Sequence, residues 1–185
     1  MKGQEARIGP DAGARSSSGY ASFVAMDFET ADAYRDSACQ VAMVRVEDGE
    51  IVARFSSLLR PPRRHFTTSW VHGITWDDVR DAPTFEEAWP RMQAIVAGVE
   101  NLAAHNASFD RSVLRACCEA ADLALPTLDF ICTVQASRRT WGLPRHRLPD
   151  VCNFLGIPLR HHDAVSDAEA CARILIEARK AGYER

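Results

Sequence analysis

Two apolar stretches joined by an Asp-Gly pair constrain the fold of this 185-residue chain more than any other feature. Residues 39–47 (CQVAMVRVE) and 50–59 (EIVARFSSLL) flank Asp48-Gly49, a pair that favours a tight hairpin turn. A short apolar run before them, residues 22–28 (SFVAMDF), is typical of a buried strand. The chain is therefore expected to open with three strands in an antiparallel meander.

The rest of the chain alternates between helical and strand patterns. TFEE (84–87) has the form of a capping box and precedes apolar positions with helical spacing. Ser108 is expected to cap one helix, and Ser166 with Glu169 to form the capping box of the last helix. The elements expected after the meander are a helix from 84, a strand over 101–105, a helix from 108, a strand over 128–133, short helices over 133–140 and 147–155, and a last helix from 166.

This order predicts an α/β fold with a mixed five-stranded sheet, in which three antiparallel strands are followed by parallel strands and helices cover both faces. Residues 21–185 are expected to form a single domain with a sizeable core. Residues 1–20 are rich in Gly, Ser and Ala and have no hydrophobic periodicity, so they are predicted to be a mobile tail.

The cellular setting is constrained by what the sequence lacks. No apolar run approaches the length of a membrane span, and the N-terminal residues have no hydrophobic core of the kind found in a secretory signal. The six cysteines include no C-x-x-C pair, which disfavours a zinc site or a disulfide framework and indicates buried free thiols. A cytoplasmic protein is expected.

Acidic residues recur where predicted elements begin or end. Asp27 and Glu29, within FVAMDFETAD (23–32), are two residues apart at a strand end, so both side chains are expected on one face. Asp110 closes HNASFD (105–110) in the first turn of a predicted helix. Each of these acids alone has a structural explanation, such as a polar turn or a helix dipole.

A fourth acidic residue comes near the end of the chain. Asp167 lies in the first turn of the last predicted helix, and His162 precedes it by five residues in HDAVSDA (162–168). Taken together, the four carboxylates supply the dense set of hard oxygen ligands that two Mg²⁺-type ions require. The ordered set therefore indicates a two-metal nuclease.

These three motifs resemble those of the DnaQ-like, or DEDDh, 3′–5′ exonuclease family, which includes the proofreading epsilon subunit of bacterial DNA polymerase III. FVAMDFET resembles the family's first motif, HNASFD its second and HDAVSDA its third, and VHGITWDDVRDAPTF (71–85) resembles the segment after its third strand. The resemblance covers roughly residues 22–180 and implies a ribonuclease H-like fold.

The resemblance also implies the roles of individual residues. Two divalent cations, Mg²⁺ or Mn²⁺, would be held by Asp27, Glu29, Asp110 and Asp167. His162 would act as general base; the adjacent His161 competes for that role but lacks the five-residue spacing to Asp167. The residues expected to contact the terminal nucleotide are Phe28, Thr30, His72, Ile74 and Asn106.

The implied activity is hydrolysis of phosphodiester bonds at the 3′ end of single-stranded DNA, with release of nucleoside 5′-monophosphates. Alternatives are a 3′–5′ exoribonuclease acting on short RNA, and a non-catalytic module that binds nucleic-acid ends beside a polymerase. A ribonuclease H-fold endonuclease or integrase is disfavoured by the His-x4-Asp motif. A DNA polymerase is a candidate partner, although the chain ends soon after its last helix, which favours a free-standing enzyme. Monomer and dimer both remain open.

Net charge and charge distribution point in different directions. The formal net charge is −3, which by itself argues against a nucleic-acid partner. Residues 60–65 (RPPRRH) and 138–147 (RRTWGLPRHR) nevertheless form two basic runs without an acidic residue. Either run is a candidate for phosphate contact, and each could equally be a solvated surface.

Overall fold

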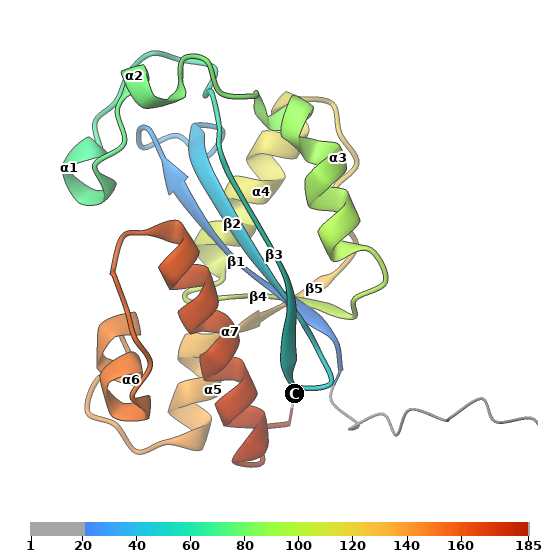
Figure 1. Cartoon of the computed structure of the whole chain (residues 1–185), viewed down its shortest axis with the longest axis vertical. Helices are drawn as coiled ribbons and strands as arrows, with labels where there is room; N and C mark the ends of the chain where they lie inside the picture. The colour runs from blue at the N-terminus through green and yellow to red at the C-terminus, as the bar shows by residue number, and fades with distance from the viewer. Residues whose placement is uncertain (1–20, 185) are drawn as a thin grey trace, which may run out of the picture.

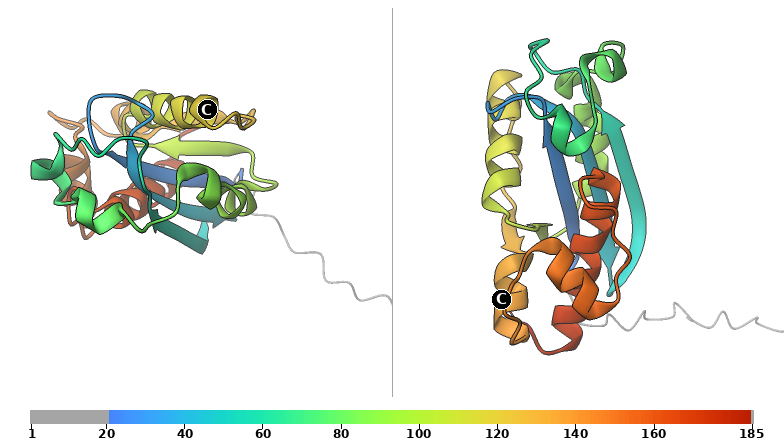
Figure 2. Two further views of the ribbon diagram at one scale, coloured as in Figure 1. Left: turned by 90° about the horizontal axis from the view of Figure 1, so that it is seen from above. Right: turned by 90° about the vertical axis from the view of Figure 1, so that its left-hand side faces the viewer.

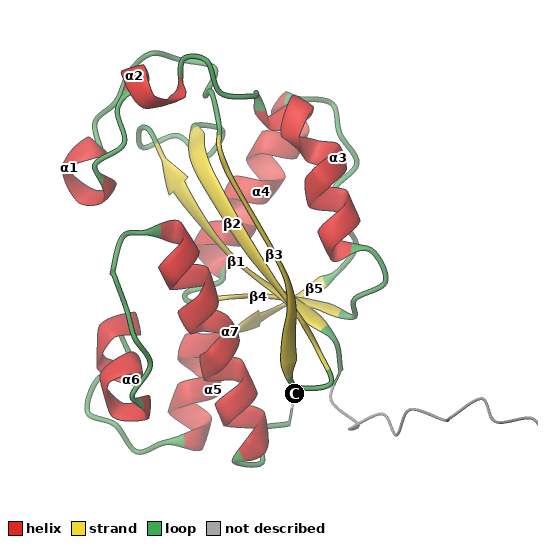
Figure 3. Cartoon of the chain, in the orientation of Figure 1, coloured by secondary structure: helices red, strands yellow, loops and turns green. Residues whose placement is uncertain are grey.

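The structure, a computed structural model, describes residues 21–184, and the tail predicted over residues 1–20 lies outside this range. A mixed five-stranded sheet with the order β3-β2-β1-β4-β5 forms its centre (Figures 1 and 3). The strands are β1 (Phe23–Thr30), β2 (Ala38–Glu47), β3 (Glu50–Leu58), β4 (Asn101–Ala104) and β5 (Asp129–Cys132). β1, β2 and β3 pair antiparallel, whereas β4 and β5 extend the sheet in parallel from β1. The predicted fold class is confirmed.

The hairpin between β2 and β3 turns at the predicted Asp-Gly pair. Asp48 has a φ of 49° and Gly49 a φ of 79°. Two successive positive φ values match the twist of the flanking strands in a two-residue turn. The turn therefore sets the pairing of Glu47 with Glu50, and the register of the hairpin shifts once beyond it, between Arg45 and Val46.

Seven helices complete the described part of the chain. They are α1 (Ser69–His72), α2 (Trp76–Val79), α3 (Phe85–Val96), α4 (Ser108–Ala120), α5 (Thr133–Thr140), α6 (Leu148–Leu155) and α7 (Ala164–Lys180). The one-turn helices α1 and α2 were not expected, because four residues are too few to reveal a helical period. α3 begins as predicted, with a complete capping box between Thr84 and Glu87.

Two predicted helix caps are wrong. Ala107, not Ser108, is the N-cap of α4, and the Ser108 hydroxyl donates to Asn106 Oδ1 instead. α7 begins two residues before Ser166, and its N-cap is Asp163, whose carboxylate accepts the Val165 N–H at 3.2 Å. The Ser166 hydroxyl accepts the Arg160 N–H at 2.8 Å, so it serves the preceding loop.

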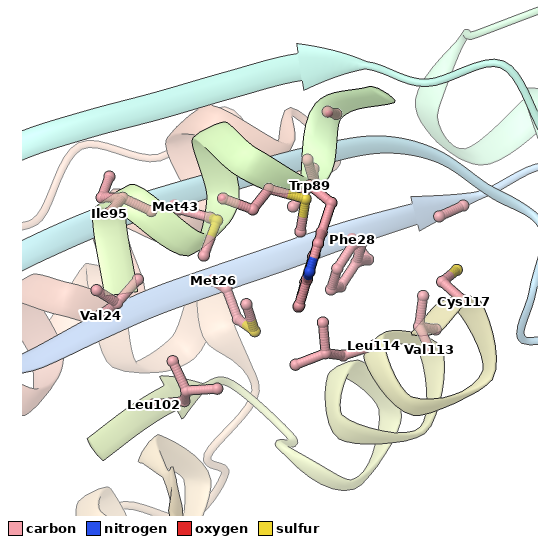
Figure 4. Packing of buried hydrophobic residues seen from close by; sticks show 14 of the residues in the cluster. Val24, Met26, Phe28, Met43, Trp89, Ile95, Leu102, Val113, Leu114 and Cys117 are labelled. Carbon is pink, nitrogen blue, oxygen red and sulfur yellow. The ribbon is translucent and has the colours of Figure 1, made fainter. Parts of the chain in front are cut away.

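The two faces of the sheet are covered differently. α3 and α4 cover one face, where Val24, Met26 and Phe28 of β1 pack into a large apolar cluster with Trp89 and Leu114 (Figure 4). α7 covers the other face, as the two views in Figure 2 show, and packs there against Phe23, Ala25 and strand β2. Alternate residues of β1 therefore serve alternate faces.

Two further expectations concern cysteines and membranes. All six cysteines are free, and five of them are buried, as predicted. Within the described residues, no helix is both long and apolar enough to cross a bilayer.

Candidate active site

The first two predicted acids lie on the α7 face of β1. Asp27 and Glu29 share this face with the buried residues Phe23 and Ala25, because side chains alternate along a strand. Both acids are half-buried. The pairing between β1 and β2 shifts register between Glu29 and Thr30, so the strand is irregular where the acids emerge.

Small residues on α7 bring a third acid close to this pair. Ala164, Ala168 and Ala172 recur every four residues along the helix and are fully buried against the sheet. Methyl groups let a helix approach a sheet closely. Asp167, which lies in the first turn and is only 4% exposed, is therefore held beside β1.

The fourth acid reaches the site from the opposite side of the sheet. Asp110 lies in the first turn of α4, which follows the carboxyl end of β4. Its carboxylate is 2% exposed, and Oδ1 accepts the Phe28 N–H of β1 at 3.0 Å. This hydrogen bond ties Asp110 to the β1 residue that separates Asp27 from Glu29 in the sequence, at the carboxyl edge of the parallel pair β1 and β4.

Burial and mutual repulsion make this cluster electrostatically costly. Burial, followed by repulsion from Asp110 and then Asp167, raises the pKa of Asp27 well above its usual range. The same effects, with Asp167 now the first of the repelling charges, raise the pKa of Glu29 to about 7. Burial raises the pKa of Asp110 to about 7, although the Phe28 hydrogen bond opposes the rise, and burial also raises that of Asp167. Cations at this position would relieve the repulsion.

The donor set fits a hard divalent cation. Asp167 Oδ1 is buried, and no group in the described part of the chain donates a hydrogen bond to it. A buried carboxylate oxygen without a partner is costly, whereas a bound metal ion would satisfy it. Carboxylate oxygens are also the ligands that Mg²⁺ and Mn²⁺ prefer.

Two stacked histidines lie beside Asp167. The ring centroids of His161 and His162 are 3.9 Å apart. His161 Nδ1 lies 3.0 Å from Asp167 Oδ2, and the same oxygen accepts the backbone N–H of His162 at 3.1 Å. Ring nitrogens of both histidines and an Asp167 oxygen all lie within 4.8 Å of one another. The loop therefore presents two imidazoles to the site.

His162 is the more unusual of the two residues. Its φ is 68°, a left-handed conformation that non-glycine residues rarely adopt, and its side chain is exposed. Partial desolvation of the ring and the neighbouring His161 lower the pKa of His162 below its ordinary value. This shift favours the neutral imidazole, which is the form that accepts a proton. Asp163, which follows it, caps α7 and pairs with Arg160 at 3.1 Å.

Two of the predicted nucleotide-contacting residues are largely engaged by the fold itself. Phe28 is 3% exposed and packs its ring in the core, which leaves only its main chain for a nucleotide (Figure 4). Thr30 is 8% exposed, and its carbonyl accepts hydrogen bonds from Thr68 Oγ1 and, at 3.2 Å, from His72 Nε2.

The other three lie around the site in different ways. His72 is half-buried and clamps α1 to the end of β1, since its Nδ1 also accepts the Ile74 N–H at 3.0 Å. Ile74 is half-buried against Ala31 and its neighbours. Asn106 is exposed, has a φ of 71° and lines a cavity together with Asp27 and Asp167. Asn106 is therefore the most accessible of the five.

That cavity contains residues that the motifs alone did not single out. It encloses about 830 Å³, and besides the acids its walls include His105, His161, Arg138, Arg145, His146 and Arg147. His105 is the first residue of HNASFD, and the arginines belong to the second basic run. His105 and the basic run are both visible in the sequence, but nothing in the sequence indicates that they lie beside the carboxylates.

The chain matches a known family along most of its length. The model of the RNase T family, described as "Exonuclease", matches residues 24–175. The chain is 33% identical over 168 residues to a PolC-type DNA polymerase III of Bacillus cereus and 35% identical over 158 residues to that of Oceanobacillus iheyensis. These matches cover 88% and 83% of the chain but only 12% and 11% of the polymerases. The chain thus spans about an eighth of the length of these relatives.

Solved structures share the same fold. A structure of exonuclease X in complex with 5′-overhanging duplex DNA is 29% identical, with a TM-score of 0.71 over 88% of this chain and 94% of that one. The nuclease domain of 3′hExo, a DEDDh family member bound to rAMP, has a TM-score of 0.74 at 20% identity, over 90% and 96% of the two chains. E. coli exonuclease I with an oligonucleotide has a TM-score of 0.72 at 18% identity, over 86% of this chain and 41% of that one. At these two lower identities, the likeness is one of fold.

Proposed function

This chain belongs to the RNase T family of exonucleases, in its DEDDh group of 3′–5′ phosphodiester hydrolases, and from that premise we propose that it removes nucleotides singly from the 3′ end of single-stranded DNA. The products would be nucleoside 5′-monophosphates. One observation carries the proposal: four costly carboxylates from three separate elements converge on one edge of the sheet, and one of their buried oxygens has no partner in the described chain.

We propose that Asp27, Glu29, Asp110 and Asp167 hold two divalent cations. When bound, such ions activate a water molecule and stabilise the charge that develops on the leaving 3′ oxygen. The Phe28 N–H keeps Asp110 oriented toward this position, and the His162 N–H does the same for Asp167. Neither acid needs to reorganise when the substrate arrives.

A ring nitrogen of His162 is proposed to take the proton of the attacking water. Its lowered pKa keeps the imidazole in the basic form at neutral pH. Its exposed side chain and strained backbone suit a group that must face the substrate. His161, which contacts Asp167, is proposed to support that acid rather than to act as the base.

The preference for DNA rests on which comparisons are close. The relatives above 30% identity carry the name of a DNA polymerase, and the 29% identical exonuclease X was solved with duplex DNA. The relative solved with rAMP is only 20% identical. A DNA polymerase is also the candidate protein partner, because the matching segments of the relatives belong to much longer polymerase chains. Co-elution with a replicative polymerase tests that partnership.

The decisive experiment compares linear DNA, linear RNA and circular DNA. Single-stranded oligonucleotides of matched sequence are incubated with Mg²⁺ or Mn²⁺, and the products are separated by chromatography. Nucleoside 5′-monophosphates released from linear DNA, with circles left intact, are expected. Faster release from RNA would make the enzyme an exoribonuclease, and cleavage of circles would make it an endonuclease.

Two variants show whether any observed activity belongs to this site. Asp110→Asn is expected to abolish release while the protein remains folded. Asp81→Asn, which changes an exposed carboxylate outside the cavity, is the matched control and should retain full activity. Release by Asp110→Asn at the parent rate would contradict the assignment of the carboxylates.

A further inference from the structure

The two basic runs have different environments in the structure. In the first run, Arg63 forms ion pairs with Asp32 at 3.2 Å and Asp36 at 2.5 Å. Arg64 lies over the Trp76 ring, 5.2 Å from its centroid. The guanidinium group of Arg63 is therefore neutralised within the protein and that of Arg64 packs on an aromatic ring, and neither residue lines the cavity that contains Asp27 and Asp167.

The second run faces the carboxylates. Arg138, at the end of α5, and Arg147, just before α6, line the same cavity as Asp27 and Asp167. Both arginines are exposed, and neither forms an ion pair within the described residues. Arg145 lines the cavity as well; it lies 3.3 Å from Asp150 and is 71% exposed. Three cationic side chains thus surround one side of an acidic site.

Hydrogen bonds hold this basic segment against the edge of the sheet that carries the carboxylates. His105, which directly follows β4, accepts the Thr133 hydroxyl at Nδ1 (2.9 Å) and donates from Nε2 to the His146 carbonyl (3.1 Å). The His146 ring in turn lies 2.9 Å from the Ser137 hydroxyl. His146 sits between Arg145 and Arg147, so the segment that carries them is fixed at two points.

We propose that Arg138, Arg145 and Arg147 bind the backbone phosphates of the substrate strand on the 5′ side of the scissile bond. This inference rests on the proposed exonuclease function. A strand that places its terminal phosphodiester beside Asp27 and Asp167 must carry its next phosphates away from these acids. The arginine-lined wall is contiguous with both acids and supplies the compensating positive charge.

The chemistry of this wall has consequences for substrate choice. Contacts between guanidinium groups and phosphates carry no sequence information, so the wall should accept any base sequence. It also favours substrates long enough to place phosphates along it. Very short oligonucleotides should therefore be cleaved with a higher KM than longer ones.

The test separates the strand from the chemistry. Hydrolysis of a twelve-nucleotide oligothymidylate is compared with that of the p-nitrophenyl ester of thymidine 5′-monophosphate, which has one phosphodiester and no upstream strand. The variants are Arg138→Gln, Arg147→Gln and the double substitution. Arg139→Gln is the matched control, because Arg139 is the exposed neighbour of Arg138 in α5 but does not line the cavity.

Each of the two single substitutions is expected to raise the KM for the oligonucleotide about threefold to tenfold at moderate salt, with kcat and cleavage of the ester unchanged. The dependence of affinity on salt should become less steep by about 0.7 in the log–log slope for each phosphate that the protein no longer neutralises. The KM of the Arg139→Gln control should stay within about twofold of that of the parent at an ionic strength of about 0.15 M, where the Debye length is about 8 Å.

Two results would overturn the inference. Equal KM values for the Arg138, Arg147 and Arg139 variants would exclude a strand-binding role, and an equal loss on the ester would assign the arginines to the chemistry or to folding. Anisotropy of the labelled oligonucleotide with Ca²⁺ gives an independent readout. If the parent binds the oligonucleotide through these arginines but hydrolyses neither substrate, the proposed nuclease activity is wrong, whereas the proposed binding of the oligonucleotide by the arginines is supported.

Discussion

Replacing Asp110 by Asn should stabilise the metal-free protein while it abolishes catalysis. Asp110 is 2% exposed, and burial raises its pKa from the ordinary value of 3.8 to about 7. An acid whose pKa is higher in the folded state binds its proton more tightly there, so folding is opposed progressively as the pH rises from about 4 to about 7. An asparagine has no charge to bury, and its Oδ1 can still accept the Phe28 N–H.

The expected magnitude follows from the size of the shift. One pKa unit corresponds to about 1.4 kcal/mol, so ionising Asp110 in the folded state at pH 8 withdraws on the order of 4 kcal/mol of unfolding free energy. At pH 4, where the carboxyl is mostly protonated in the folded state and partly so in the unfolded state, the difference should fall below about 1 kcal/mol. Asn at this position also removes a repelling charge from Asp27.

Urea unfolding in EDTA at pH 4 and pH 8 measures this difference directly. The variant should be more stable than the parent at pH 8, and the two should nearly coincide at pH 4. Asp81→Asn, which replaces an exposed carboxylate outside the site, is the matched control in the same unfolding experiment. Adding Mg²⁺ should stabilise the parent, by about 2.7 kcal/mol at a hundredfold excess over Kd, and should stabilise Asp110→Asn less. A variant that is no more stable than the parent at pH 8 would refute the account of Asp110 as a buried, costly metal ligand.

Three further predictions concern other residues of the site and of α7. His162→Ala should lower kcat by about 10²-fold or more, because it removes the proposed base, whereas His161→Ala should cost much less; the reverse order in single-turnover rates would make His161 the base. Ala168→Leu should destabilise the protein by about 1–3 kcal/mol, because the fully buried methyl packs against the sheet, and should also weaken Mg²⁺ binding by shifting Asp167; full activity with an unchanged metal titration would show that the helix position does not matter. Asp163→Ala should lower the unfolding free energy by about 1 kcal/mol because it removes the α7 cap, with exonuclease activity retained, as thermal unfolding and product assays would test.

The sequence predicted those parts of the fold that depend on short-range signals. The Asp-Gly turn and the Thr84 capping box lie where local chemistry decides the backbone. The caps expected at Ser108 and Ser166 failed because each hydroxyl found a different partner nearby, Asn106 in one case and the Arg160 N–H in the other. Several donors and acceptors compete at a helix start, and a spacing rule cannot rank them.

In the site, too, local patterns were predictable and long-range contacts were not. The motifs predicted the four acids, since each lies at a strand end or in the first turn of a helix. The link between His105 and the His146 carbonyl joins residues 41 positions apart, and it depends on how the segment between α5 and α6 packs beside the end of β4. Which of two basic runs faces the carboxylates is likewise a property of the packed structure, because Arg63 is neutralised only after Asp32 and Asp36 are brought beside it.

The alanine face of α7 sets a distance in the active site. Ala164, Ala168 and Ala172 set how far the helix stands from the sheet, and hence the gap between Asp167 and the β1 acids. That gap is fixed by methyl groups that never meet solvent or substrate. Changes of one or two carbon atoms in these buried side chains can therefore alter the spacing of the carboxylates without replacing any carboxylate. Differences in activity between related chains can thus originate in residues that do not line the cavity.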